Sequence, residues 1–290
     1  MEYATLSNGV KMPMLGFGVY QIPPEDCERC VIDAIKVGNR LIDTAQYYNN
    51  EAAVGNAIQK SGIPREDFFI VTKVWFTNDG YKKTKVSIDE SLAKLKTSYV
   101  DLLLIHKPVS DYYGSYRAME DAYREGKARA IGVSSFNPKL FKKLYDFAEI
   151  KPMVNQVETH VFFQQKELHE LMNRLGVKHM SWAPFAEGEN GFFRNPLLTS
   201  IGKKYGKSVA QVALRFMLQS DIILIPKSTH IERMEQNFDV FDFELSDEEM
   251  KSIEMLDRDK SIFGAEYNPI TGKALYFLSE LRKKVCLMDK

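Results

Sequence analysis

The sequence lacks an excess of charge of either sign, since 39 lysine and arginine residues balance 39 aspartate and glutamate residues among 290. Proteins that bind nucleic acids usually carry a basic excess, so this balance argues against that class. No apolar run approaches the roughly 20 residues that a membrane-spanning helix needs, and the amino terminus has no basic segment followed by an apolar one. There are only three cysteines, an odd number that is typical of a reducing compartment. We therefore expect a cytoplasmic, monomeric protein that binds neither nucleic acid nor membrane.

The sequence does contain enough apolar residues for a large core. Hydrophobic residues make up 44% and charged residues 27% of the chain, which is typical of a globular protein. No low-complexity segment or domain boundary is evident, and the length suits one α/β barrel of about 250 residues plus insertions. We expect residues 1–290 to form one domain with residues 258–290 as a C-terminal tail, whose path across the barrel mouth would shape specificity.

The first residues predict a β-hairpin. Residues 3–6 and 10–12 flank Asn8-Gly9, a pair suited to a type I′ turn. A hairpin in front of a barrel would cover the amino-terminal ends of its strands. Residues 14–20 are predicted to be the first barrel strand. Two glycines occur in it without the third that a dinucleotide-binding fingerprint requires.

Strands and helices then alternate. The predicted strands cover residues 14–20, 40–43, 69–73, 100–105, 128–133, 153–157, 179–183 and 222–225. The predicted helices begin at Pro23, cover residues 51–61, 82–96 and 115–125, begin near Pro138, cover 165–175 and 196–219, and begin near Glu232. Right-handed strand-to-helix units repeated eight times close a parallel (β/α)8 barrel, the TIM barrel. One further helix is predicted from Ser246, with Glu249 completing a capping box.

Cys27 and Cys30 form a Cys-x-x-Cys pair, which is compatible with a redox or zinc site. Both also fall on the apolar face of the first helix, and the remaining Cys286 is far away along the chain. The interpretation that we favour is two small apolar residues on a buried helix face.

Asp43, Tyr48, Lys73 and His106 each lie at or just beyond the end of a predicted strand. The carboxyl ends of parallel strands meet at the end of a barrel where ligands bind. A tyrosine with an ordinary pKa near 10 needs a nearby cation to donate its proton at neutral pH, and Lys73 could supply it, with Asp43 as counter-ion. His106 could hydrogen-bond a carbonyl oxygen. The set predicts a proton-donating site for carbonyl reduction. Taken singly, each residue also has a structural explanation, such as a helix cap or a solvated side chain.

These segments resemble the signatures of the aldo-keto reductases. Residues 41–45 with Tyr48 and Asn50-Glu51 are similar to the first signature of the family, and residues 72–75 and 104–106 to the segments that carry its lysine and histidine. The resemblance runs from the hairpin to about residue 257. It implies that Tyr48 is the general acid, that Lys73 and Asp43 tune it, and that His106 orients the substrate carbonyl.

The resemblance also implies that NADPH/NADP+ is the cofactor. Residues 131–136 and 155–158 resemble segments that bind the nicotinamide carboxamide, residues 181–184 the ring-stacking position, and residues 225–229 with the following helix the site of the 2′-phosphate and adenine. The implied cofactor residues are Ser134, Ser135, Gln156, Trp182, Ala183, Phe185, Lys227, Ser228, Thr229, Arg233, Gln236 and Asn237. Ser135 replaces the usual asparagine, Trp182 the commoner tyrosine and Gln236 a frequent glutamate. The structural alternatives are a core aromatic for Trp182 and a solvated helix start for Lys227 and Arg233.

On the substrate side, Tyr20 and Trp75 are expected to line the pocket together with His106. Lys107 stands where many relatives have tryptophan, which favours a polar or anionic small-molecule carbonyl substrate unless the side chain points to solvent. Residues 187–193 could close over the cofactor with their glycines as hinges.

Two other functions stay open at this point. His106, Glu158 and His160 end two strands and could bind zinc in a metal-dependent hydrolase, although no second histidine follows His160 at helical spacing. The protein could also be a non-catalytic relative that binds NADPH, which the intact set of four residues argues against.

Overall fold

The computed structural model describes residues 1–264, and the predicted tail therefore lies outside the described residues from position 265 onward. Eight parallel strands follow one another around a barrel in sequence order. They are β3 (Phe17–Gly18), β4 (Leu41–Asp43), β5 (Phe69–Val74), β6 (Leu102–Ile105), β7 (Ile131–Ser134), β8 (Val154–Glu158), β9 (Lys178–Trp182) and β10 (Ile222–Leu224).

Backbone hydrogen bonds between the residues just before β3 and the last residue of β10 close the barrel. Gly16 N donates to Leu224 O at 2.8 Å, and Leu224 N donates to Met14 O at 2.8 Å. The glycines of this segment serve close packing, because a Cβ atom on Gly18 would lie 2.8 Å from Ile225 O. The predicted (β/α)8 barrel is confirmed, with a first strand shorter than residues 14–20.

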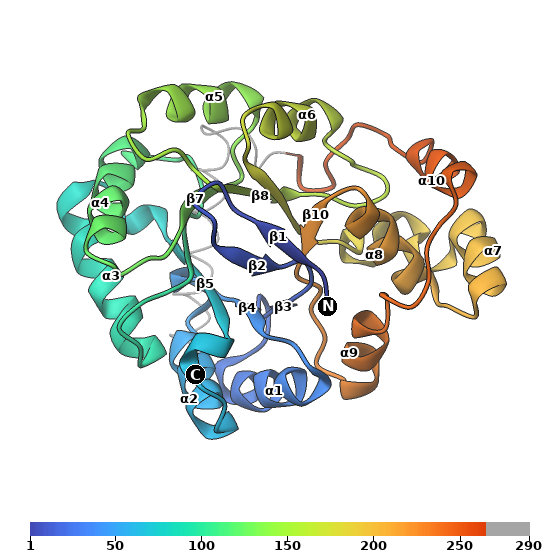
Figure 1. Cartoon of the computed structure of the whole chain (residues 1–290), viewed down its shortest axis with the longest axis horizontal. Helices are drawn as coiled ribbons and strands as arrows, with labels where there is room; N and C mark the ends of the chain where they lie inside the picture. Colours follow the sequence, from blue (N-terminus) through green and yellow to red (C-terminus); the bar gives the residue numbers. More distant parts are fainter. Residues whose placement is uncertain (265–290) are drawn as a thin grey trace, which may run out of the picture.

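Helices surround the barrel, as Figure 1 shows. They are α1 (Pro24–Val37), α2 (Glu51–Ser61), α3 (Tyr81–Leu95), α4 (Tyr112–Arg124), α5 (Pro138–Phe147), α6 (Lys166–Arg174), α7 (Pro196–Tyr205), α8 (Val209–Gln219), α9 (Ile231–Phe238) and α10 (Asp247–Glu254). Short 3₁₀ segments are η1 (Gln46–Tyr48), η2 (Arg65–Asp67), η3 (Phe76–Asn78) and η4 (Ala186–Arg194). None of the helices in the described residues is long and apolar enough to cross a membrane.

Two helix predictions were wrong in their bounds. The single helix predicted over residues 196–219 is two helices, because Gly206 adopts a φ of 66° at the end of α7 and Ser208 forms a capping box with Gln211 at the start of α8. Helix α4 begins at Tyr112 instead of residue 115, since the Asp111 carboxylate accepts a hydrogen bond of 2.9 Å from Gly114 N.

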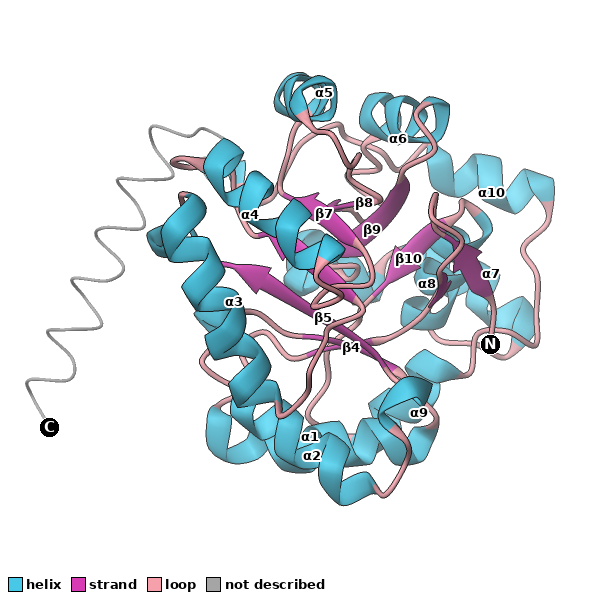
Figure 2. Ribbon diagram, turned by 60° about the vertical axis from the view of Figure 1, so that its left-hand side comes forward, coloured by secondary structure: helices cyan, strands magenta, loops and turns pink. Residues whose placement is uncertain are grey.

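The antiparallel strands β1 (Tyr3–Thr5) and β2 (Lys11–Pro13) form the predicted hairpin in front of the amino-terminal end of the barrel (Figures 1 and 2). Its tip is held there by Asn8 Nδ2, which donates to Arg129 O at 2.9 Å, two residues before β7. Met12 is fully buried in the same apolar cluster as Leu41 and Phe69, the first residues of β4 and β5. The hairpin therefore closes this end with apolar side chains.

The cysteines of α1 lie in the core, as the favoured interpretation states. Cys27 and Cys30 are free, fully buried thiols among apolar neighbours. Burial raises the pKa of Cys27 to about 12, so this thiol is inert as a nucleophile at neutral pH.

Candidate active site

The site begins where β4 ends, at the opposite end of the barrel from the hairpin. Asp43 is the last residue of β4, and η1 turns the chain so that Tyr48 lies back over that strand end. Asn50 fixes the turn, because its Oδ1 accepts from Thr44 Oγ1 at 2.8 Å and its Nδ2 donates to Val19 O at 2.9 Å. The segment is thus held to its own strand and to the loop after β3.

Lys73, in β5, contacts two of the other three predicted catalytic residues, Asp43 and Tyr48. Its Nζ forms an ion pair with Asp43 Oδ1, donates to Thr44 O at 3.0 Å and donates to the phenol oxygen Oη of Tyr48 at 3.3 Å. Lys73 is fully buried and Asp43 is 2% exposed. A buried charge needs a partner, so these two side chains depend on each other.

Burial governs the ionisation of this cluster. It lowers the pKa of Lys73 and raises that of Asp43, while the opposite charge of each partner works against both shifts. Burial, followed by the Asp43 charge and Tyr20, raises the pKa of Tyr48 well above its usual value. The phenol therefore keeps its proton. Because the phenol oxygen accepts from Lys73, and no described residue accepts from its O–H, that hydrogen is available to a bound molecule.

His106 follows β6 and lies beside the phenol. Its ring meets those of Tyr48 and Trp75 edge-on, with centroids 5.6 Å and 4.8 Å away. Burial, assisted by the charges of Lys73 and Lys107, holds the pKa of His106 well below its ordinary value, so the imidazole is neutral. Its buried Nδ1 has no hydrogen-bond partner among residues 1–264.

Gln156, in β8, connects the predicted carboxamide site to these residues. Its Nε2 donates to Asp43 Oδ2 at 2.7 Å. Ser134 ends β7, and Ser135, with a φ of 63°, donates its N–H to Gln156 O at 2.8 Å. The link from Gln156 to Asp43 was not predicted, because it spans 113 positions and only closure of the barrel creates it.

The predicted ring-stacking residue ends β9. Trp182 is half-buried, and its ring meets that of Phe263 at 5.0 Å with an angle of 62° between the planes. Ala183 adopts a φ of 52°, and the Phe185 ring contacts Phe192 at 5.9 Å. Trp182 therefore stands at the barrel mouth, which does not fit the alternative of an ordinary core aromatic.

The predicted phosphate site lies after β10, at the start of α9. Ser228 is buried, and its Oγ accepts from His230 N at 3.1 Å. Lys227 and Arg233 are exposed, and neither forms an ion pair with another described residue. Thr229 is half-buried, Gln236 exposed and Asn237 buried. Two uncommitted cations at a helix amino terminus are a donor set that fits a phosphomonoester.

Aromatic residues flank the catalytic cluster on the predicted substrate side. Tyr20 is 45% exposed, and its ring lies 4.9 Å from that of Tyr48. Trp75 stacks on Tyr47 at 4.2 Å and 20°. Tyr47 was missed by the sequence reasoning, although its position next to Tyr48 is a signal. Lys107 is half-buried beside His106.

The alternative zinc site is not formed. Glu158 and His160 bond to each other at 3.1 Å, and Glu158 also accepts from Ser261 and from Ile262 N. Within residues 1–264 no group of three or more histidine, cysteine or acidic side chains is placed to hold a metal ion. The geometry therefore does not support a metal-dependent hydrolase built on these residues.

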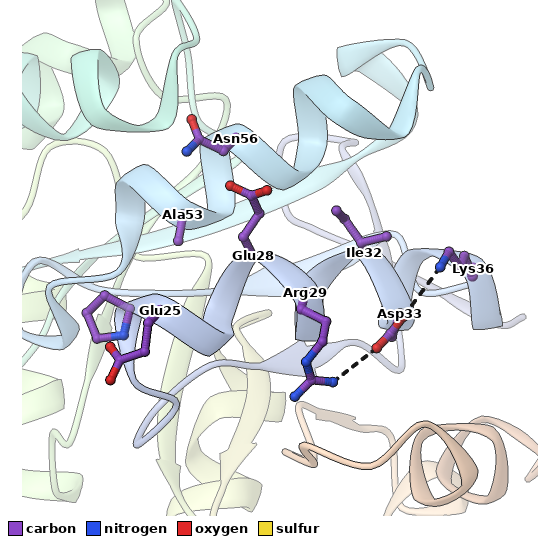
Figure 3. Close-up of a pocket in the computed structure, with 9 residues that line it drawn as sticks. Glu25, Glu28, Arg29, Ile32, Asp33, Lys36, Ala53 and Asn56 are labelled. Atoms are coloured by element: carbon purple, nitrogen blue, oxygen red, sulfur yellow. Dashed lines mark hydrogen bonds and ion pairs between the residues drawn. The ribbon is translucent and has the colours of Figure 1, made fainter.

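A surface groove elsewhere on the molecule shares no residue with this site. Figure 3 shows that it runs along α1 beside α2 and is lined by Glu25, Glu28, Arg29, Ile32, Asp33, Lys36, Ala53 and Asn56. Arg29 and Lys36 both bond to Asp33 there. These are solvated pairs on a helix face, and such pairs contribute little to stability.

Comparison with known proteins identifies relatives over almost the whole described part. The model of a family described as "Aldo/keto reductase family" matches residues 13–258. A glyoxal reductase of Bacillus subtilis (strain 168) is 45% identical over 259 residues, covering 89% of this chain and 93% of that protein. A 9,11-endoperoxide prostaglandin H2 reductase of Trypanosoma cruzi (strain CL Brener) is 43% identical over 271 residues, covering 92% and 96%. The structure of a Bombyx mori aldo-keto reductase in complex with NADP matches with a TM-score of 0.85 at 32% identity, covering 89% and 94%.

Proposed function

Because the chain belongs to the aldo/keto reductase family, we propose that it is an NADPH-dependent reductase that converts an aldehyde or a ketone to an alcohol. The observation that carries the proposal is the position of Lys73 Nζ, between the Asp43 carboxylate and the Tyr48 phenol oxygen. This contact places a cation beside a protonated phenol whose hydrogen no described residue accepts.

Each of the four residues then has one role. NADPH, when bound, supplies a hydride for the carbonyl carbon. The Tyr48 phenol donates its proton to the carbonyl oxygen, and the Lys73 ammonium stabilises the phenolate that remains. Asp43 keeps Lys73 charged and in place. The neutral His106 imidazole orients the carbonyl oxygen without adding a second positive charge.

The residues at the later strand ends fit the cofactor. Gln156 donates a hydrogen bond from Nε2 to Asp43, so its Oε1 could accept a hydrogen bond from the nicotinamide carboxamide, beside Ser134 and Ser135. The Trp182 indole would stack on the nicotinamide ring. Further around the barrel, Lys227, Ser228 and Arg233 bind the 2′-phosphate, with Thr229 beside them and Gln236 and Asn237 near the adenine.

The substrate is a small carbonyl compound. One relative is a glyoxal reductase and another a methylglyoxal reductase of Escherichia coli, which makes short, polar aldehydes the first candidates. Lys107, next to His106, would favour polar or anionic substrates. Replacing Lys107 with tryptophan should shift preference from a keto acid towards an apolar aldehyde, and an unchanged preference would show that Lys107 does not face the substrate.

We also propose that the protein is a monomer in the cytoplasm.

The decisive experiment is the Tyr48→Phe variant, assayed by NADPH oxidation with glyoxal or methylglyoxal. We expect turnover to fall by about 10² to 10⁴, the usual contribution of general acid catalysis. Tyr3→Phe, at the opposite end of the barrel, is the matched control and should keep full activity. Steady turnover in Tyr48→Phe would contradict the assignment. No turnover in the parent protein with any carbonyl compound would favour a non-catalytic NADPH-binding relative.

Cofactor choice is tested separately, by titrating NADPH and NADH while following tryptophan fluorescence. The chain has only two tryptophans, Trp75 and Trp182, and both lie at the site. Tighter binding of NADPH than of NADH supports the phosphate site at α9. Equal binding of the two would remove that part of the proposal.

A further inference from the structure

Glu158 is a buried carboxylate at the barrel mouth that the reaction above does not use. It is the last residue of β8, is 0% exposed, and is the register partner of Trp182 in β9. Three donors from the described part of the chain converge on it. His160 Nε2 lies 3.1 Å from Oε1, Ile262 N donates to Oε1 at 2.9 Å, and Ser261 Oγ donates to Oε2. Phe162 N donates to His160 Nδ1, so the proton of this imidazole is on Nε2, facing the carboxylate.

Two of these donors belong to a segment that arrives from far along the chain. The stretch after α10 is seated on the loop between β8 and α6, where Arg258 N donates to Phe162 O at 2.9 Å and Gln164 N donates to Asp257 Oδ1 at 3.2 Å. From there the chain reaches Glu158 at Ser261 and Ile262. The next residue, Phe263, places its ring against the indole of Trp182.

We propose that Glu158 is a positioning residue of the reductase site, which holds residues 261–263 so that Phe263 sets the orientation of the Trp182 indole. A carboxylate that accepts a main-chain N–H and a hydroxyl fixes the segment at two points, and hydrogen bonds to a charged group are the stronger ones. Phe263 then restricts the indole through an edge contact. An indole fixed before binding loses less freedom when a flat ring stacks on it, so Glu158 acts on cofactor affinity through Phe263.

The kinetic part of this inference rests on the proposed function, while its structural part does not. The structural part is tested by hydrogen exchange of the peptide that covers residues 259–264. Glu158→Gln keeps the size of the side chain and loses an acceptor oxygen and the charge. We expect its exchange to be about tenfold faster, as loss of a charge-assisted bond allows local opening. Ser261→Ala removes the hydrogen bond from Ser261 to Glu158 without changing a core residue, and it should give a smaller increase in the exchange rate. This variant still tests the proposal if Glu158→Gln folds poorly.

Glu120 provides a matched control. It is also a buried carboxylate that accepts two main-chain hydrogen bonds, from Glu149 N at 2.7 Å and Ile150 N at 2.9 Å, and those residues lie just before β8, at the other end of the barrel. Glu120→Gln should leave exchange of residues 259–264 and the KM for NADPH unchanged. If both glutamine variants speed exchange of this peptide equally, Glu158 acts only on general stability and the proposal fails.

The route through Phe263 is tested by combining variants. We expect Glu158→Gln and Phe263→Ala each to raise the KM for NADPH about fivefold with little change in kcat, since they affect binding and not the proton donor. The double variant should match Phe263→Ala alone, because Glu158 acts through that ring. If the rise in KM of the double variant equals the product of the rises in the two single variants, Glu158 acts by another route and the proposal is overturned. If NADPH does not bind at all, the proposed function fails, and the exchange experiment still decides whether Glu158 holds the segment.

Discussion

A buried aspartate lies at each end of the barrel, and the two are used differently. Asp101 directly precedes β6 at the amino-terminal end and accepts from Arg65 at 2.7 Å, Arg129 at 2.7 Å and Ile70 N at 2.9 Å. Asp43 ends β4 at the carboxyl-terminal end and accepts from Lys73 and Gln156. Both carboxylates are paired.

The difference lies in the neighbours. Around Asp101 the donors come from two arginines and a main-chain amide, which hold the strand ends together. Around Asp43, Lys73 extends the cluster to Tyr48, and no described residue accepts a hydrogen bond from the Tyr48 O–H. The neighbouring His106 has a buried Nδ1 without a hydrogen-bond partner among residues 1–264. A fully paired buried charge stabilises structure, whereas a paired charge beside an uncommitted donor can do chemistry.

The largest expected effect comes from Lys73→Met. It should abolish NADPH-dependent turnover to the level of Tyr48→Phe or below, and lower the free energy of unfolding by about 3 to 5 kcal/mol, because Asp43 is left buried without its counter-ion. Urea unfolding and steady-state kinetics measure the two effects. Lys85→Met, which removes an exposed pair with Glu125, should change the unfolding free energy by less than about 1 kcal/mol. Full activity in Lys73→Met would mean that the Asp43 cluster, like the Asp101 cluster, serves stability and not catalysis.

Asp101→Asn is the converse test. We expect a loss of about 2 to 3 kcal/mol in unfolding free energy, less than for a fully buried pair because Arg65 and Arg129 are 19% and 43% exposed. The kcat should remain unchanged, since this cluster lies at the end of the barrel that the hairpin covers. A tenfold fall in kcat at full folding would mean that the amino-terminal end also takes part in catalysis.

The pH dependence of stability should reveal the neutral imidazole of the site. Because the pKa of His106 is lowered in the folded protein, the unfolded chain binds a proton that the folded one does not once the pH falls below about 6.5. Stability from this group is therefore complete above that pH and is progressively lost as the pH falls below it. His179, also buried with a lowered pKa, contributes in the same direction. His106→Asn should weaken the slope between pH 5 and 6.5, and an unchanged slope would contradict the assignment.

The smallest effect is expected from Arg233→Ala. This exposed side chain has no ion-pair partner among the described residues, so its loss should leave unfolding unchanged. It should raise the KM for NADPH about tenfold while that for NADH stays constant, as one charge-assisted contact to phosphate is lost. Arg174→Ala, which removes an exposed arginine of α6, is the control. An equal rise for both cofactors would place Arg233 away from the 2′-phosphate.

Local patterns in the sequence determined the elements. Asn8-Gly9 predicted the hairpin turn, and the short apolar runs predicted eight strands, because turn chemistry and strand burial depend on neighbouring residues. The predicted helix bounds were wrong where a helix end and a helix start follow each other closely. Gly206 ends α7 and Ser208 begins α8 within the stretch that was predicted as one helix.

By itself the sequence also determined that Asp43, Tyr48, Lys73 and His106 follow strand ends and resemble a family signature. Only the tertiary structure decided which groups meet and which remain uncommitted. Lys73 bridges Asp43 and Tyr48, Gln156 reaches Asp43, and Ser261 reaches Glu158 across 103 positions. Such contacts form when the barrel closes and the chain returns over its mouth. Their geometry depends on side chains brought together from distant strands, which no local pattern encodes.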